Sequence, residues 1–155
     1  DVYKRQWEKT LRVYVCVTGD LFHYGHISFF KKAKEFGEKL IVGICSDDKA
    51  GEYKRRPILN LQERSEVIKN CALVDEVVMS APPVTDQDFM DLHKIEIVVA
   101  STEYPKNILK KYFNYPLEAG LLKLVDYTDG ISTTDIMLRC HKAVSEELAE
   151  KKYLR

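Results

Sequence analysis

The sequence predicts an α/β fold in which a doubly wound, parallel, five-stranded sheet carries helices on both faces. Short apolar segments alternate with helix-like segments along the chain, and this order is typical of parallel strands joined by helices. Residues 40–45 are apolar throughout, as expected of a strand buried on both faces. The length of 155 residues fits one domain. We therefore expect a single domain over residues 1–155, with a core at about 11–140 and a C-terminal helix to about 151.

Strands and helices follow one another in a regular order. Apolar runs predict five strands, at residues 11–17, 40–45, 76–79, 95–100 and 121–125. Apolar residues at helical spacing, together with capping and helix-breaking residues, predict five helices, at residues 25–36, 61–70, 85–93, 107–113 and 132–151.

Local signals mark the ends of these helices. Gly37 stands where a C-terminal cap is favoured after the first helix. Asn60 and Glu63 have the spacing of a capping box at the start of the second. Residues 81–83 interrupt the chain before the third, and Pro116 stops the fourth. The last helix contains four apolar residues expected to pack on the domain: Ile136, Leu138, Val144 and Leu148.

Composition excludes some classes of protein. Lys+Arg and Asp+Glu both number 24, so the formal net charge is zero, which argues against nucleic-acid binding through overall charge. No apolar run approaches the roughly 20 residues that span a bilayer, and no signal peptide is evident. The four cysteines form no Cys-x-x-Cys pair, which fits a reducing compartment. We therefore expect a cytoplasmic protein without a transmembrane segment.

Two groups of residues receive a purely structural interpretation. Cys16 and Cys45 lie at predicted strands, where thiols usually act as small buried hydrophobic residues. Arg55 and Arg56 follow Lys54 in a short basic stretch. For these two arginines we expect a solvated surface turn.

The first strand-to-helix connection carries the motif His23-Tyr24-Gly25-His26. The first N–H groups of a helix lack partners and attract anions, and glycine lets the backbone approach a phosphate. Histidines can donate hydrogen bonds to a phosphorus centre that gains negative charge. In a doubly wound sheet such a connection lies where strand order reverses and ligands bind. The alternatives are structural histidines or a His-x-x-His metal pair, but no further ligands stand at zinc-site spacing.

A second polar motif follows the fifth predicted strand. Gly130 permits a tight turn, and Ser132, Thr133 and Thr134 open the last helix. Hydroxyl groups beside free backbone N–H groups suit a triphosphate. One such residue is explained by helix capping alone, but three in a row after a glycine exceed that need.

With both motifs, the chain resembles the cytidylyltransferase family of the His-x-Gly-His nucleotidyltransferase superfamily, from about residue 13 to residue 139. The stretches that carry the resemblance are 20–26, Tyr53-Lys54, 60–64, 74–78 and 130–134. The resemblance implies a Rossmann-like parallel sheet, usually in a homodimer, with the stretch at 74–78 near the dimer interface. It also implies transfer of CMP from CTP to a phosphorylated alcohol, which gives a CDP-alcohol and pyrophosphate for phospholipid synthesis.

The resemblance also implies roles for individual residues. The catalytic residues are His23, His26 and Lys54. Nucleotide binding falls to Thr18, Gly19, Gly25, Arg64, Gly130, Ile131, Ser132 and Thr133. Acceptor binding falls to Asp20, Lys54 and Tyr104. Mg²⁺ is expected to accompany CTP, and no metal-binding residues are assigned. Partners are CTP and a small phosphoalcohol, with no nucleic acid.

The chain departs from the family pattern at three places, and alternatives remain open. One of these places is the segment 100–104, which lacks the family's usual acidic pair. Tyr127 stands where the family has an arginine, and residues 17–19 lack the family's glycine and phenylalanine. One alternative is an ATP-using adenylyltransferase of the same superfamily, and another is a nucleotide-binding module without turnover. Among acceptors, phosphocholine and phosphoethanolamine are favoured over glycerol 3-phosphate.

Overall fold

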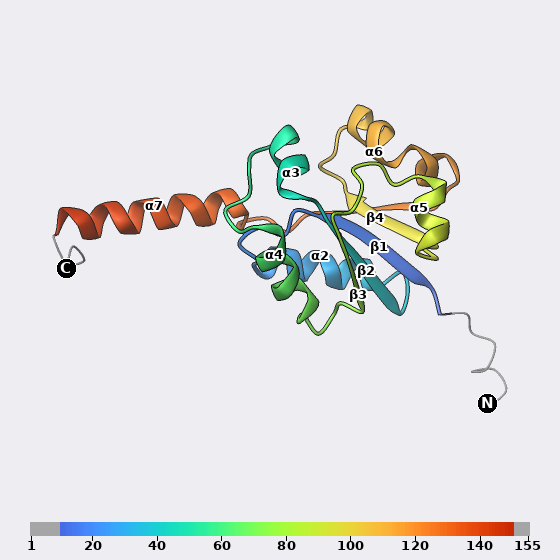
Figure 1. The fold of residues 1–155 in the computed structure, drawn as a ribbon, viewed down its shortest axis with the longest axis horizontal. Coiled ribbons are helices and arrows are strands. Elements are labelled where there is room, and N and C mark those ends of the chain that lie inside the picture. Colours follow the sequence, from blue (N-terminus) through green and yellow to red (C-terminus); the bar gives the residue numbers. More distant parts are fainter. Residues whose placement is uncertain (1–9, 151–155) are drawn as a thin grey trace.

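A five-stranded parallel sheet with the order β3-β2-β1-β4-β5 organises the chain. The structure is a computed structural model and describes residues 10–150 (Figure 1). The strands are β1 (Arg12–Val17), β2 (Lys39–Ile44), β3 (Glu76–Met79), β4 (Ile97–Ser101) and β5 (Leu122–Val125). The chain moves outward from β1 to β3 and then returns to β4 on the other side of β1. This reversal confirms the predicted doubly wound fold.

Alternation along β1 generates two cores, one on each face of the sheet. Val13 and Val15 point toward α2 (Tyr24–Lys34) and α4 (Leu61–Lys69). Tyr14 points to the opposite face, toward helices α5 (Gln87–Leu92) and α6 (Lys106–Glu118). All three side chains are fully buried. Among the described residues both faces of the sheet around β1 are covered, so a ligand site is expected beyond the ends of the strands.

The predicted strands agree with the observed ones within two residues, and β3 agrees at both ends. The predicted glycine cap of the first helix is wrong. Helix α2 ends with Glu35 as its C-cap, and Gly37 does not have a left-handed backbone. A Cβ at Gly37 would lie 2.7 Å from the carbonyl oxygen of Leu11. Glycine is therefore required there for close packing against the chain that enters β1.

One helix, α3 (Asp47–Tyr53), was not predicted. It has no apolar periodicity, and only Ala50 is buried. Its signals are local: the Ser46 side chain accepts a hydrogen bond from the backbone N–H of Lys49, and acidic residues occupy its first turn. Both features favour a helix start. Helix α3 leads directly to Lys54, its C-cap residue.

Helix α6 extends from Lys106 to Glu118, beyond the predicted end, but a kink divides it where the predicted helix 107–113 ends. Phe113 has non-helical angles (φ −130°, ψ 28°) and marks a kink. Proline lacks the N–H that would bond to the carbonyl four residues earlier, which is the carbonyl of Tyr112. The backbone N–H of Thr85 donates to this carbonyl instead, at 2.8 Å. A partner distant in the sequence therefore satisfies the group that proline leaves free.

Helix α7 (Thr133–Ala149) projects away from the sheet (Figure 1). No residue of this helix is buried. The expectation that its apolar residues pack on the domain is wrong, since Leu138, Val144 and Leu148 are exposed and Ile136 is partly exposed. Only the start of α7 contributes to the site described below. Within residues 10–150, no helix has the length and apolarity needed to cross a membrane.

Gly43 is predicted to be essential for packing on β2. A Cβ there would lie 2.0 Å from Oη of the fully buried Tyr14. Gly43→Ala should lower the free energy of unfolding by roughly 1–3 kcal/mol, because the ring must shift in a packed core. Urea unfolding measures this change. The control is Gly51→Ala, where the nearest atom is 3.7 Å away. Equal urea midpoints for the two variants would contradict the packing argument.

Candidate active site

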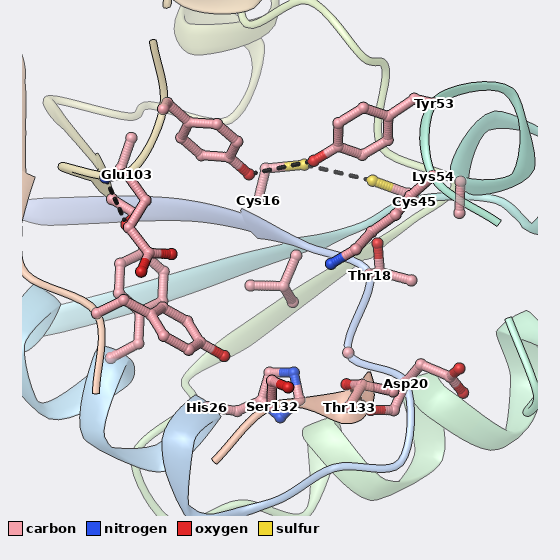
Figure 2. Close-up of a pocket in the computed structure, with 18 of the residues that line it drawn as sticks. Cys16, Thr18, Asp20, His26, Cys45, Tyr53, Lys54, Glu103, Ser132 and Thr133 are labelled. Atoms are coloured by element: carbon pink, nitrogen blue, oxygen red, sulfur yellow. Dashed lines mark hydrogen bonds between the residues drawn. The ribbon is translucent and has the colours of Figure 1, made fainter. Parts of the chain in front are cut away.

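A cavity of about 720 Å³ lies beyond the carboxyl ends of the strands and is lined by residues that follow β1, β2, β4 and β5. Its size is typical of a small-molecule site. It lies at the switch point of the sheet, where β1 and β4 are neighbours. Figure 2 shows side chains of Thr18, His26, Lys54, Ser132 and Thr133 around this cavity.

The two histidines cap helix α2. Nδ1 of His23 accepts a hydrogen bond from the backbone N–H of Gly25 at 3.1 Å. Nδ1 of His26 accepts from the backbone N–H of His23, also at 3.1 Å. A ring nitrogen that accepts a hydrogen bond carries no proton. Each neutral ring therefore carries its proton on Nε2, which leaves Nε2–H available as a donor.

The surroundings keep both rings neutral. Burial lowers the pKa of His23. Burial, followed by the nearby charge of a protonated His23, lowers the pKa of His26 to about 3, against a smaller opposing effect of Asp20. The His26 ring lines the cavity, while His23 stands behind it with ring centroids 4.0 Å apart. Nε2 of His23 is buried and has no hydrogen-bond partner among residues 10–150. The site thus provides neutral N–H donors.

Gly25 makes room for the histidine pair. A Cβ there would lie 2.8 Å from Cε1 of His23 and 3.2 Å from Cγ2 of Ile131. Gly25 does not itself line the cavity. The structure therefore explains this glycine by packing between the two motifs rather than by a close backbone approach to a ligand.

The structure brings the second motif to the first. Gly130 has a left-handed backbone (φ 83°), and the Ser132 hydroxyl caps α7 by accepting from the N–H of Asp135 at 3.1 Å. Oγ1 of Thr133 donates to the carbonyl oxygen of Asp20 at 3.0 Å. A direct hydrogen bond thus joins two residues that are separated by 113 positions in the sequence. The predicted convergence of both motifs on one cavity is present.

Asp20 holds the wall of the cavity together. Its two carboxylate oxygens accept from the backbone N–H groups of Ile58 and Leu59, at 2.8 and 2.9 Å. The side chain is buried. Because both oxygens are engaged, the geometry gives Asp20 a positioning role and does not support the predicted contact with an acceptor.

Arg64 also occupies a different place from the one expected. It is fully buried, does not line the cavity, and forms an ion pair with Asp47 at 2.6 Å. Its guanidinium donates to three backbone carbonyls, those of Thr18, Cys45 and Leu59. Arg64 therefore connects the ends of β1 and β2 to the loop before α4. A direct nucleotide contact by this side chain is not supported.

Other predicted residues line the cavity as expected. The Lys54 amine points into it (Figure 2), and no ion pair or hydrogen bond of this amine occurs within the described residues. Gly19 has a left-handed backbone (φ 69°), and a Cβ there would lie 2.4 Å from Ile68. The Tyr104 hydroxyl lies 3.3 Å from that of Tyr53. Burial raises the pKa of Tyr104, which therefore stays protonated.

Sequence reasoning missed Arg55 as a cavity residue. It is half-buried, lines the cavity and donates to Oγ1 of Thr134 at 3.4 Å. The expected solvated turn is therefore wrong for Arg55, whereas Arg56 is exposed and pairs with Asp48. The available signal was its position next to Lys54. Lys111, which also lines the cavity, had no signal in the sequence.

Positively charged side chains line the cavity and could contact phosphates, but the described residues provide no set of ligands for a metal ion. Among residues 10–150, no group of three or more His, Cys, Asp or Glu side chains could hold a metal ion. Magnesium is commonly bound through substrate phosphates. Mg²⁺ carried by a bound nucleotide therefore stays a prediction.

Comparisons with known proteins agree with this arrangement. The cytidylyltransferase-like family profile matches residues 15–139. The chain is 34% identical over 143 residues to choline-phosphate cytidylyltransferase 2 of Arabidopsis thaliana, covering 87% of this chain and 46% of that protein. It is 30% identical over 139 residues to ethanolamine-phosphate cytidylyltransferase of Dictyostelium discoideum, covering 87% of this chain and 39% of that protein. The chain thus spans less than half the length of these relatives.

A solved structure supports the fold. The lipopolysaccharide core biosynthesis protein from Thermoplasma volcanium GSS1 matches with a TM-score of 0.62 and 21% sequence identity. The match covers 79% of this chain and 100% of the other. At this identity the likeness concerns the arrangement of strands and helices alone.

Arg64→Met should destabilise the protein. The change leaves Asp47 and three backbone carbonyls without their buried donor, so the free energy of unfolding should fall by roughly 2–4 kcal/mol. Urea unfolding measures the loss. The matched control is Arg56→Met, whose side chain is 73% exposed in its pair with Asp48. That variant should change stability by no more than about 0.5 kcal/mol. A similar effect of both substitutions would exclude the buried connection.

His26 should make stability depend on pH. Its pKa is lowered to about 3 in the folded protein, whereas an unfolded histidine has a pKa of about 6.5. The unfolded state therefore binds more protons between these values, and stability is lost as pH falls below about 6.5. From pH 7.5 to 5.5 the loss from His26 should be about 1 kcal/mol.

The matched variant is His26→Gln, which cannot titrate but keeps an acceptor for the capping box. Urea unfolding at both pH values should show a smaller loss in this variant than in the native chain. An identical pH dependence would mean that His26 is not held neutral by folding.

Proposed function

Because the chain belongs to the cytidylyltransferase-like family, we propose that it transfers CMP from CTP to a small phosphorylated alcohol and releases pyrophosphate. The observation that carries this proposal is the hydrogen bond from the Thr133 hydroxyl to the Asp20 carbonyl. This hydrogen bond joins the hydroxyl-rich start of α7 to the histidine turn at one cavity. The neutral N–H donor of His26, the Lys54 amine and the N-terminus of α7 then face a common space of suitable size.

The proposed reaction needs positioning and charge stabilisation more than covalent chemistry. A phosphate oxygen of the acceptor attacks the α-phosphorus of CTP, and pyrophosphate leaves in line. Nε2–H of His26 donates to an oxygen that gains charge, and the His23 ring packs behind His26 and supports it. Because both rings are held neutral, His26 stabilises the charge through a hydrogen bond and does not transfer a proton to the substrate. Lys54 balances charge on the phosphates of both substrates.

The β- and γ-phosphates of CTP are assigned to the start of α7. Backbone N–H groups and the positive end of the helix dipole favour an anion there. Ser132 can donate its hydroxyl proton, because its oxygen only accepts from Asp135, whereas the Thr133 hydroxyl already donates to Asp20 and fixes the turn. Arg55 brings positive charge to Thr134 in the same turn. These contacts position the leaving group away from the acceptor.

Phosphocholine and phosphoethanolamine are the favoured acceptors, because the two relatives from Arabidopsis and Dictyostelium are named as cytidylyltransferases for these compounds. Three tyrosines of the cavity support this choice, since aromatic faces bind ammonium groups. Tyr53 and Tyr112 meet edge to face with centroids 6.2 Å apart, and Tyr104 joins them through the Tyr53 hydroxyl. The carboxylate of Asp20 is already engaged, so these rings are assigned the acceptor head group. Assembly as a homodimer stays a prediction.

A second candidate, a nucleotide-binding module without turnover, is favoured by Tyr127. This residue lines the cavity where the family resemblance implies an arginine. A phenol offers no charged pair of donors to phosphate, and burial raises the pKa of Tyr127, so it remains neutral.

Pyrophosphate release separates the candidates. The full chain is incubated with CTP and Mg²⁺, and with phosphocholine, phosphoethanolamine or glycerol 3-phosphate, and parallel reactions contain ATP. Release that requires both CTP and an acceptor supports the proposed transfer. Release that requires an acceptor and occurs with ATP but not with CTP would indicate an adenylyltransferase. CTP binding by calorimetry without release under any condition would favour the module without turnover.

Two substitutions should impair the reaction through different contacts. His26→Ala should lower kcat by roughly 10²–10³, the effect of removing one preorganised donor. Lys54→Ala should lower kcat/KM, since it removes charge that faces the phosphates. The control is Lys142→Ala on the exposed part of α7, which pairs only with the exposed Glu146 in the described structure and should leave kcat/KM within about twofold. Near-native kinetics of His26→Ala would contradict its assigned role.

A further inference from the structure

Two cysteines meet at the cavity. Cys16 is the penultimate residue of β1 and Cys45 directly follows β2, and their sulfur atoms lie 3.8 Å apart (Figure 2). Both residues line the cavity and are half-buried. The expectation that they act as inert buried hydrophobic residues is therefore incomplete. The proposed transfer reaction uses neither thiol.

Strand register explains why these thiols meet. Cys16 is aligned with Gly43 in the parallel pair of β1 and β2. Cys45, two residues beyond Gly43, projects from the same face of the sheet because side chains alternate along a strand. The pairing continues past β2, since the N–H of Cys45 donates to the carbonyl of Val17 at 3.1 Å. The two sulfur atoms are thus held together by the backbone.

The environment makes the two thiols unequal. The thiol of Cys16 is in hydrogen-bond contact with the Cys45 sulfur, which lowers the pKa of Cys45. The charge of Arg64, whose guanidinium also donates to the Cys45 carbonyl at 2.9 Å, favours the thiolate further. The same contact and burial raise the pKa of Cys16. A reactive thiolate beside a protonated thiol is the arrangement in which oxidised cysteines are resolved as disulfides.

We propose that Cys16 and Cys45 are a modification site at which hydrogen peroxide forms a reversible disulfide across the cavity wall. The Cys45 thiolate attacks one peroxide oxygen, the O–O bond breaks, and hydroxide leaves and takes up a proton as water. The Cys16 sulfur then attacks the resulting sulfenic sulfur of Cys45. The S–O bond breaks, and hydroxide leaves with the Cys16 proton as a second water. Two thiols lose two electrons to one peroxide.

Disulfide formation changes the cavity. The sulfur atoms must approach from 3.8 Å to about 2.05 Å. The Cys45 backbone is hydrogen-bonded to Val17 and Arg64, so a shift of Cys45 strains these contacts and is passed to the connection to α3. This connection passes through Ser46, the N-cap of α3, and α3 ends at Lys54. Oxidation should therefore displace Lys54. This consequence for turnover rests on the proposed function, whereas the disulfide itself does not.

The chemical test uses the variant Cys71→Ser/Cys140→Ser, because neither of these cysteines lines the cavity. The reduced protein is treated with hydrogen peroxide, alkylated, digested and analysed by mass spectrometry. A peptide pair joined through Cys16 and Cys45, lighter by two hydrogen atoms and separated by dithiothreitol, is expected. Alkylation of both thiols, or sulfinic acid at Cys45 without a bridge, would overturn the proposal. Peptide mapping of the native chain gives the same readout if this variant does not fold.

A further variant tests the order of attack. In Cys16→Ser the sulfenic acid on Cys45 lacks its partner, so a 1,3-diketone probe should label Cys45 strongly after peroxide treatment. In the chain with both thiols this labelling should be brief and weak. If Cys16 in the Cys45→Ser variant is labelled more strongly than Cys45 in the Cys16→Ser variant, the assignment of Cys45 as the attacking thiolate is overturned.

The functional test compares pyrophosphate release before oxidation, after peroxide and after dithiothreitol. Release should fall at least about tenfold on oxidation and recover on reduction, while Cys16→Ser keeps its own level throughout. A disulfide that leaves release unchanged would overturn the connection to Lys54. A chain without any release would refute the proposed function, and mass spectrometry would still decide whether the disulfide forms.

Discussion

The buried guanidinium of Arg64 is the interaction on which the cavity depends. A fully buried charge is tolerated only when its donors are satisfied. Here Asp47 and the carbonyls of Thr18, Cys45 and Leu59 satisfy them. These acceptors lie just after β1, just after β2, at the start of α3 and in the loop before α4, so one side chain holds these parts of the chain together. Asp20 continues this framework from the other side by binding two backbone N–H groups of the same loop.

Within this framework, structural and chemical roles coincide in the histidine turn. A helix start needs acceptors for its free N–H groups, and His23 and His26 provide them through Nδ1. Capping therefore decides which ring nitrogen carries the proton. Burial then keeps the rings uncharged. The donors that the proposed reaction needs arise from the same contacts that begin α2.

Much of this arrangement could be predicted from local sequence patterns. Apolar runs identified the strands because burial on both faces leaves a continuous signal, and the Asn60–Glu63 capping box identified the start of α4. The predictions failed where the deciding partner is remote in the sequence. Thr85 satisfies the carbonyl that Pro116 leaves free, so helical turns continue after the kink in α6. Three of the acceptors of Arg64 are backbone carbonyls. The contact between Cys16 and Cys45 depends on strand register, and α3 has too little apolar surface for periodicity to show.

The bond from Thr133 to the carbonyl of Asp20 has a consequence for the timing of assembly. Its two residues lie near opposite ends of the described chain, and contacts of such large sequence separation close the longest loops and form slowly. During synthesis, a nascent chain can build β1, α2 and β2 long before residue 133 leaves the ribosome. Such incomplete chains contain the histidine turn but lack the start of α7 that completes the cavity. The cavity is therefore complete only when translation of this region is nearly finished.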